Sequence, residues 1–432
     1  MSDTTIVAVH GRRVWDSRGR PTVEAELHLA GGAIGRAIAP AGASTGSGEA
    51  IELRDGGSKL GGRDVQRAIA AINGEIAAAL IGRDAADQTA IDQRLIALDG
   101  SQQKRRLGGN SLVAVSMAAL HAAAAAAGRP LYAHLLGDAA EAVLPLPEIQ
   151  IFGGGAHAGR RVDIQDFMVV APGAASFDQA LEWTAEIYRA AGSLMAERGL
   201  LQGVADEGGF WPAFDSNEAA LDALMRAIER AGFTPGQEIA ISLDIAASEF
   251  HENGRYRLVL DGSALDGDAM AEMLIGWLDR YPIVSIEDPL AEDDAEGLHR
   301  FTQAVGDRVQ IVGDDFLVTN ADRVGAAAAQ GSCNAVLIKP NQAGTVTEAK
   351  AALDAARAAG WGAIVSARSG ETEDVTIVHL AVGWGVGQLK VGSFARSERM
   401  AKWNEALRIE EALGSRARFA GAAPLMTRGR KR

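Results

Sequence analysis

The fold of this chain can be read from residues 309–339, which run VQIVGDDFLVTNADRVGAAAAQGSCNAVLIK. A short apolar run, Val309–Gly313, ends at Asp314, and a second one, Ala335–Ile338, ends at Lys339. The alanine-rich residues between the two runs are compatible with a helix, because alanine has the highest intrinsic helix propensity. A strand, a helix and a second strand within about 30 residues are typical of a parallel β-α-β unit.

The same rhythm continues on both sides of that unit. Further apolar runs of strand length are Ile239–Leu243 before Asp244, Ile283–Ile286 before Glu287, Ala363–Ser366 before Ala367 and Gly387–Leu389 before Lys390. From Glu287 onward the strand ends are about 25 residues apart, which is the length of one strand, loop and helix. The repetition predicts an α/β fold with a (β/α)8 barrel, in which residues that end the strands meet in one pocket.

The length of the chain predicts a second domain in front of the barrel. At 432 residues it exceeds the roughly 250 to 300 residues at which a single core stops growing. The alternating runs Thr5–Val9 and Val23–Leu29 and an alanine-rich helix over residues 111–128 indicate a small α+β cap. Prolines in Leu144–Pro147 interrupt any helix there. We therefore expect an α+β capping domain with a lid loop over residues 1–142 and the barrel with the catalytic site over residues 143–432.

Composition and charge exclude several classes of protein. A composition of 47% hydrophobic and 23% charged residues suits a globular protein, and a net charge of −14 argues against a nucleic-acid surface. The single cysteine, Cys333, cannot form an internal disulfide and lies in an apolar run, which predicts a buried thiol. Residues 1–9 do not resemble a signal peptide, and no stretch approaches the ~18 apolar residues of a membrane span. We expect a cytoplasmic protein that binds neither nucleic acid nor membrane.

Three carboxylates at strand ends predict a metal site. Taken alone, an acid such as Asp314 more often caps a helix than binds a ligand. Asp244, Glu287 and Asp314 together would bury three negative charges, which requires a cation. Oxygen ligands with no cysteine or histidine nearby favour a hard ion, so Mg²⁺ is preferred over Zn²⁺ or Ca²⁺.

Two lysines at neighbouring strand ends would face that ion. A nearby cation disfavours the charged form of a lysine, so Lys339 or Lys390 could act as a neutral base. An ion that binds a substrate carboxylate acidifies the adjacent C–H, so we predict proton abstraction α to a carboxylate. The alternative is that both lysines only neutralise the acids.

Other segments could complete such a site. Glu207, in the turn Ala205–Gly209, could supply the acid for a leaving group. The glycine-rich loops at residues 41–46 and 153–159 are either mobile covers or plain surface loops. Arg368 and Ser369 offer a guanidinium and a small donor suited to a phosphate.

With these features in order, the chain closely resembles the enolase family over residues 4–421. The matching motifs are Asp16-Ser17-Arg18-Gly19, Gly42-Ala43-Ser44-Thr45-Gly46, Val162-Asp163-Ile164-Gln165, Asp206-Glu207-Gly208-Gly209, Ser285-Ile286-Glu287-Asp288, Gly313-Asp314-Asp315 and Arg368-Ser369-Gly370-Glu371-Thr372-Glu373-Asp374. The resemblance implies an enolase-type modified barrel behind an α+β cap. It also implies a homodimer or higher oligomer, and dehydration of 2-phosphoglycerate to phosphoenolpyruvate.

The resemblance also implies roles for single residues. As metal ligands it implies Asp244, Glu287 and Asp314 for the first Mg²⁺, and Ser44 in the lid for the second. As catalytic groups it implies Lys339 as the base, Glu207 in the acid machinery and Asp166 as the neighbour of the acid. As substrate contacts it implies His157 on a closing loop, Gln165, Lys390 on the carboxylate, and Arg368 with Ser369 on the phosphate.

The sequence departs from the family pattern close to the substrate. Ala367 stands where the family carries a substrate-contacting histidine, and Asp166 replaces a glutamate. Since proton transfer depends on sub-ångström placement, both changes should impair simple water elimination. Arg160 and Arg161 add two positive charges beside the closing loop, either as solvated lid charges or as contacts for a larger anionic substrate.

These departures favour a specialised paralogue. An enolase-like enzyme of this kind is carboxyphosphonoenolpyruvate synthase of phosphinothricin-type antibiotic pathways, which builds a phosphonate-bearing enolpyruvate from an activated phosphonoformate. We therefore expect substrates that are small anionic phosphates or phosphonates. The alternatives are an ordinary enolase and a binding or scaffold protein that has lost catalysis.

Overall fold

The computed structural model describes residues 2–137 and 141–425, and its cap is built on a three-stranded antiparallel sheet. The strands are β1 (Ile6–Trp15), β2 (Pro21–Leu29) and β3 (Ile34–Ile38), in the order β1-β2-β3. Both strands predicted for the cap are present. The cap helices are α1 (Gln66–Ala71), α2 (Ala77–Leu80), α3 (Gln88–Asp99), α4 (Gly109–Ala126) and α5 (Leu131–Leu136).

Helix α4 packs directly on this sheet. A Cβ atom added to Gly35 of β3 would lie less than 3.0 Å from the Ala118 carbonyl, so the helix and strand backbones approach closely. Contrary to the expectation from the sequence, α4 is long and apolar enough to cross a membrane. Because 83% of that segment is buried inside the protein, it serves here as a core helix.

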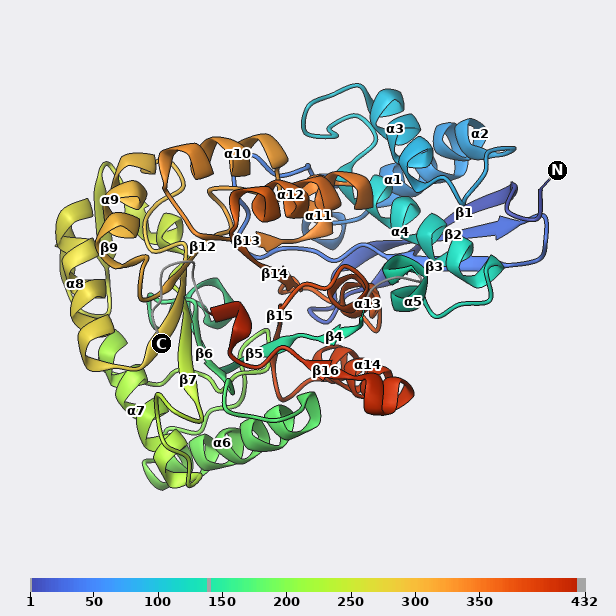
Figure 1. Cartoon of the computed structure of the whole chain (residues 1–432). Coiled ribbons are helices and arrows are strands. Elements are labelled where there is room, and N and C mark those ends of the chain that lie inside the picture. The colour runs from blue at the N-terminus through green and yellow to red at the C-terminus, as the bar shows by residue number, and fades with distance from the viewer. Residues whose placement is uncertain (1, 138–140, 426–432) are drawn as a thin grey trace.

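In the described part of the chain, eight strands close into a barrel in the order β11-β12-β13-β14-β15-β5-β6-β7 (Figure 1). They are β5 (Leu146–Gly153), β6 (Asp166–Val170), β7 (Ala240–Asp244), β11 (Ile283–Glu287), β12 (Gln310–Gly313), β13 (Ala335–Ile338), β14 (Gly362–Ser366) and β15 (Gln388–Ser393). The six apolar runs singled out in the sequence are β7 and β11 to β15. Strands β5 and β6 were not recognised, because neither fits the repeat: β5 ends in a glycine, and β6 follows it with no α-helix between them.

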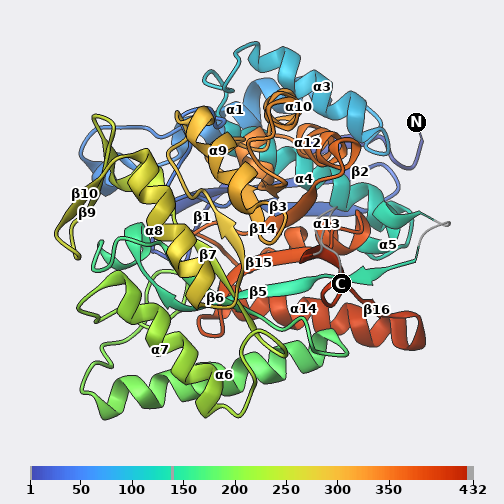
Figure 2. The same ribbon diagram turned by 60° about the vertical axis from the view of Figure 1, so that its left-hand side comes forward.

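Strand β6 gives the barrel its modified form. It runs antiparallel to both of its neighbours, with Gly153 of β5 and Asp244 of β7 paired to Asp166. Figure 2 shows β5 next to β15, with β6 and β7 following. Because β6 is reversed, its first residue lies at the edge where the parallel strands end, which places Asp166 at the mouth of the barrel.

Helices surround the barrel (Figure 1). They are α6 (Phe177–Glu197), α7 (Asn217–Arg230), α8 (Gly267–Arg280), α9 (Ala295–Val305), α10 (Ala321–Gln330), α11 (Pro340–Ala343), α12 (Val346–Ala359), α13 (Thr376–Gly383) and α14 (Ser397–Leu413). Many begin at a Ser, Thr, Asp or Asn side chain that accepts a hydrogen bond from a backbone N–H of the first turn, which has no partner within the helix. These N-caps are Ser176, Ser216, Asp266, Asp294, Asn320 and Thr345.

Short strands complete the fold. They are β4 (Val143–Leu144), paired with β16 (Arg418–Phe419), and the β8 (His251–Glu252), β9 (Arg255–Leu258) and β10 (Ser263–Leu265) sheet. One continuous hydrophobic cluster includes Ile6, Leu112, Val336 and Val365, and so joins the cap to the barrel. The cap therefore sits against the barrel, where its loops can reach the barrel mouth.

Candidate active site

The three predicted metal carboxylates lie together at the mouth of the barrel. Asp244 and Glu287 are the last residues of the adjacent strands β7 and β11 and are paired in register. Asp314 follows β12 directly. All three are buried. Parallel strands thus bring residues that are far apart in the sequence to one edge, as the strand pattern predicted.

Both predicted lysines contact these carboxylates. Lys390 lies within β15, not after it, and its Nζ is 2.7 Å from Asp244 Oδ2 and 2.8 Å from Glu287 Oε2. Lys339 follows β13 and donates to Asp314 Oδ2. Burial lowers the pKa of each lysine, but the adjacent carboxylates outweigh burial and raise it.

The raised pKa of Lys339 reflects the carboxylate beside it. The side chain that contacts Lys339 is Asp314, and the expectation that a bound metal cation would disfavour its ammonium form stays a prediction. An opposite charge within hydrogen-bonding distance favours the ammonium. Lys339 can therefore act as a base only when another cation takes over the negative charge of Asp314.

The carboxylates fit a hard cation. Glu287 Oε1 is buried and has no hydrogen-bond partner among the described residues. Burial and the charge of Asp244 raise the pKa of Glu287 well above its usual value, because the site carries more negative charge than the lysines offset there. An unused carboxylate oxygen beside two others matches the oxygen donors that Mg²⁺ prefers. Asp244, Glu287 and Asp314 would hold this ion.

A second acidic group lies next to Asp314. Oxygens of Asp288, Asp314 and Asp315 lie within 4.8 Å of one another. Both carboxylate oxygens of Asp288 accept backbone N–H groups, at 2.8 Å, from Asp314 and Asp315. Burial and Asp314 raise the pKa of Asp288 to about 8. Since Asp288 is engaged by the backbone, its evident role is to orient the turn after β12.

His157 connects the predicted acid groups. It lies in a short 3-10 turn, Gly155–Ala158, and is buried. Its Nδ1 is 3.0 Å from Asp166 Oδ1, and its Nε2 is 2.9 Å from Ser369 Oγ. The same Nε2 is 3.7 Å from Glu207 Oε1. Burial lowers the pKa of His157, but Glu207 and Asp166 outweigh burial and raise it to about 9.

The carboxylates around His157 come from two different elements. Asp166 begins β6, and burial would raise its pKa, but His157 and Lys390 outweigh burial and lower it. Glu207 lies in a tight turn, in which Gly208 has a φ of +95°. This arrangement can hold a proton between an imidazole and two carboxylates at one side of the pocket, which is the requirement for general acid–base work.

The predicted phosphate-binding arginine has a partner that the sequence did not suggest. Arg368 Nη1 is 2.9 Å from Glu49 Oε2, and its Nη2 donates to the Ser44 carbonyl at 3.0 Å. Glu49 comes from the cap loop that also carries Ser44, and Gln165 Nε2 is 3.5 Å from Ser44 Oγ. The cap loop is therefore bound to the barrel mouth through charged and polar side chains.

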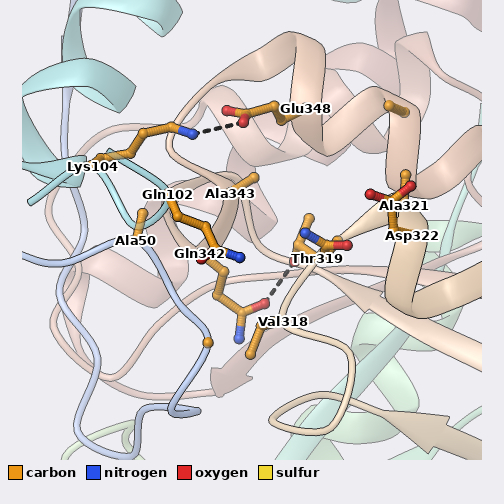
Figure 3. Close-up of a pocket in the computed structure, with 13 residues that line it drawn as sticks. Ala50, Gln102, Lys104, Val318, Thr319, Ala321, Asp322, Gln342, Ala343 and Glu348 are labelled. Carbon is orange, nitrogen blue, oxygen red and sulfur yellow. Dashed lines mark hydrogen bonds and ion pairs between the residues drawn. The ribbon is translucent and has the colours of Figure 1, made fainter. Parts of the chain in front are cut away.

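Gln342 is a further residue that the sequence did not suggest. Its Nε2 donates to Asp314 Oδ1 at 2.8 Å, and its Oε1 accepts from Thr319 Oγ1 at 2.6 Å. Figure 3 shows Thr319 and Gln342 at the edge of a cavity of about 210 Å³, where Lys104 pairs with Glu348. In the sequence, a role of Gln342 in the site was indicated only weakly, by its position three residues after Lys339.

Arg160 and Arg161 are not among the residues that line the site. Arg160 Nη2 pairs with Glu249 Oε2 at 2.8 Å, and the Arg160 side chain is 65% exposed. Because this ion pair lies in solvent, it contributes little to stability. For Arg160 this geometry matches the solvated lid charges that were one of the two expectations, while contact of the two arginines with a larger anionic substrate stays a prediction.

Eleven of the predicted site residues surround a cavity of about 20 Å³, whereas Glu287 and Asp314 are not among the residues that line it. The eleven are Ser44, His157, Gln165, Asp166, Glu207, Asp244, Lys339, Ala367, Arg368, Ser369 and Lys390. That volume holds about one water molecule. A phosphorylated three-carbon acid therefore requires the cover loops or the lysines to move before it can bind.

Two family models match the chain. Residues 6–135 match the model described as "Enolase, N-terminal domain". Residues 141–427 match the model described as "Enolase, C-terminal TIM barrel domain". Together they cover both the cap and the barrel.

Proposed function

The chain belongs to the enolase family, and we propose that it is a magnesium-dependent enzyme that removes the proton α to a carboxylate. The substrate of that step is a compound like 2-phosphoglycerate, which carries the α-hydrogen, and a compound like phosphoenolpyruvate is its product or the substrate of the reverse reaction. The observation that carries the proposal is the buried set of Asp244, Glu287 and Asp314 with Lys339 and Lys390 at the barrel mouth. Such a concentration of buried charge is costly and is typical of a catalytic site.

Each group has a definite task in this proposal. Asp244, Glu287 and Asp314 would hold Mg²⁺, which would supply positive charge beside the substrate carboxylate when bound. Lys339 takes the proton from carbon 2, and Lys390 pairs with the substrate carboxylate. Arg368 and Ser369 bind the phosphate, for which Arg368 must exchange Glu49 for the ligand. His157, held by Asp166 and close to Glu207, donates the proton that the leaving group needs.

We further propose that the enzyme is a specialised paralogue, such as a carboxyphosphonoenolpyruvate synthase of phosphonate biosynthesis. Ala367 lines the cavity with only a methyl group, so that point of the wall offers neither a donor nor an acceptor to a leaving hydroxyl. Asp166 is one methylene shorter than a glutamate. A site without that donor should be slow at simple dehydration and should leave space for a larger phosphonate partner.

An ordinary enolase is the second candidate. The intact contact between His157 and Asp166 favours it, because it suits a working proton path. A binding or scaffold protein without catalysis is disfavoured, since such a protein has no need of a buried charged cluster.

The proposal extends to the setting in which the enzyme works. A homodimer or a higher homo-oligomer in the cytoplasm, acting on small anionic phosphates or phosphonates, suits the acidic chain and the family. Neither nucleic acid nor a membrane is required as a partner.

The proposal is tested by ³¹P NMR. The protein is incubated with Mg²⁺, phosphoenolpyruvate or 2-phosphoglycerate, and an activated phosphonoformate, beside a Lys339→Ala control. We expect a new phosphonate-bearing enolpyruvate signal with the parent protein, and none with Lys339→Ala or in EDTA. No such product, together with rapid interconversion of 2-phosphoglycerate and phosphoenolpyruvate, would instead identify an ordinary enolase.

A further inference from the structure

Gln150 is a buried side chain that touches both halves of the acid machinery. It lies on β5 and is 0% exposed. Its amide Nε2 donates to Asp166 Oδ1, and its Oε1 accepts from the backbone N–H of Gly209 at 2.8 Å. One side chain therefore connects the start of β6 with the turn that carries Glu207.

We propose that Gln150 is a positioning residue that sets where Asp166 meets His157. In this pair the lengths of Gln150 and Asp166 are matched, so the site takes a longer acid at position 166 only if residue 150 is shortened. This inference rests on the proposed function, because it deepens the assignment of His157 and Asp166 to proton transfer.

The strand geometry directs Gln150 at Asp166. Strands β5 and β6 pair Gln150 with Met168 and Gly153 with Asp166, and the register shifts between Gln150 and Phe152. An irregularity of this kind re-aims a side chain, and bulges are common beside active sites. Gln150 therefore reaches diagonally across the strand pair, from its place opposite Met168 to Asp166 two residues away.

The space around the Gln150 amide is filled on two sides. A Cβ atom at Gly209 would lie less than 3.0 Å from Gln150 Oε1. One at Gly153 would lie 3.0 Å from Gln150 Oε1 and 2.6 Å from Ala205 Cβ. Because glycine occupies both positions, the amide fits between them, and it has no room to retreat when its neighbour grows.

The hydrogen bonds of Asp166 show what Gln150 controls. Asp166 Oδ1 accepts hydrogen bonds from Gln150 Nε2 and His157 Nδ1, and these two bonds engage both lone pairs of that oxygen. Asp166 Oδ2 has no hydrogen bond among the described residues and faces Lys390 at 3.4 Å. The amide thus fixes which oxygen His157 meets, and His157 Nε2 is thereby directed toward Ser369 and Glu207.

Lengthening Asp166 should disturb this arrangement. In a close-packed site one added methylene forces neighbours off their preferred positions. Asp166→Glu would drive the carboxylate against the Gln150 amide, whereas Gln150→Asn would draw the amide back by the same length. Combining the two substitutions conserves the total side-chain volume.

The test is a double-mutant cycle of Gln150→Asn and Asp166→Glu. The matched control is Gln310→Asn, another buried barrel glutamine, whose Nε2 bonds to Gln388. The first two readouts are the ¹⁵N shifts of the His157 ring in the substrate-free protein and the melting temperature. The third is kcat and KM, measured for 2-phosphoglycerate and for phosphoenolpyruvate together with the activated phosphonoformate.

We expect each single variant to shift the His157 ring signal and to lower kcat about 10-fold or more, with KM changed less. The double variant should return both quantities toward the parent, while Gln310→Asn should not rescue Asp166→Glu. Additive effects of the two substitutions on the ring signal, or equal rescue by Gln310→Asn, would overturn the inference. If the parent turns over neither substrate, the proposed function fails, yet the ring signals still decide the role of Gln150.

Discussion

At the scale of single residues, the charges at the barrel mouth stabilise one another. Lys390 bridges Asp244 and Glu287, and Lys339 contacts Asp314, so two ammonium groups lie where a metal site needs positive charge. A buried ion pair is costly to break, because the remaining charge is left without a partner. In the proposed mechanism a bound Mg²⁺ would take the place of Lys339 as the cation beside Asp314, which would leave Lys339 free for proton transfer.

His157 gives a prediction about pH. Its pKa of about 9 in the folded protein lies above the unfolded value of roughly 6.5. The proton on His157 therefore stabilises the fold fully below about pH 6.5, and this stabilisation is lost as the pH rises to about 9. We expect the free energy of unfolding of the metal-free protein, measured with urea, to fall by on the order of a few kcal/mol over this range.

The control separates His157 from other groups. The carboxyl group of Asp288, whose pKa is raised to about 8, also makes the free energy of unfolding fall as the pH rises toward 8. His157→Gln should remove part of the slope, whereas Val259→Ala, at an 80% exposed side chain that does not titrate, should leave the slope as in the parent. An unchanged slope in His157→Gln would mean that the imidazole is not protonated in the fold.

The sequence predicted most of these residues but not their contacts. Residues that end apolar strands stand out, which is why the carboxylates and lysines could be found. Glu49, Gln342 and Gln150 could not, because a buried polar side chain is recognised only by its partners in space.

At the scale of elements, one reversed strand and one tight turn position the acid groups. Strands β7 and β11 to β15 follow the repeating β-α pattern and were predicted. Strand β6 escaped prediction, since no α-helix separates it from β5 and its direction depends on pairing with β5 and β7. Its reversal brings Asp166 to the barrel mouth, opposite the turn that carries Glu207.

The turn gives a second prediction. Gly208 has a φ of +95°, and an added Cβ would lie 2.5 Å from the Ala395 carbonyl. Gly208→Ala should therefore displace Glu207 and lower kcat by about 10-fold or more. Gly254→Ala is the matched control, because Gly254 has a φ of +73° but nothing within 4 Å of an added Cβ.

Gly254→Ala should add only the backbone strain of about 1 kcal/mol that is expected for a side chain at a positive φ. Steady-state kinetics and thermal unfolding of both variants distinguish the two effects. If Gly254→Ala lost as much activity as Gly208→Ala, the position of Glu207 would not be what the turn controls.

At the scale of the whole molecule, the cap and the barrel meet around the site. Glu49 from the cap holds Arg368 of the barrel, and Lys104 of the cap pairs with Glu348 on α12. The two-domain plan could be predicted from length and from the change of rhythm near residue 144. The contacts between the parts could not, because they join residues that are hundreds of positions apart.

Metal binding should stabilise the entire chain. A ligand that binds the folded state alone raises the melting temperature with its concentration. We expect Mg²⁺ to raise the melting temperature of the parent, and Asp244→Ala, Glu287→Ala and Asp314→Ala each to abolish both this rise and turnover. Asp293→Ala, at a 76% exposed side chain, should behave like the parent. Full turnover in EDTA would refute the metal requirement.

The central claim is that Lys339 performs Mg²⁺-dependent proton transfer at carbon 2, in a site poorly equipped for simple dehydration. It is tested most directly by incubating 2-phosphoglycerate with the protein and Mg²⁺ in D₂O. Deuterium at carbon 2 is followed by NMR, and phosphoenolpyruvate by its ultraviolet absorbance. We predict exchange that is faster than elimination in the parent and absent in Lys339→Ala. Elimination should rise when Ala367→His and Asp166→Glu are combined with Gln150→Asn. Exchange at the parent rate in Lys339→Ala would contradict the claim, as would a parent protein that already eliminates water as fast as the triple variant.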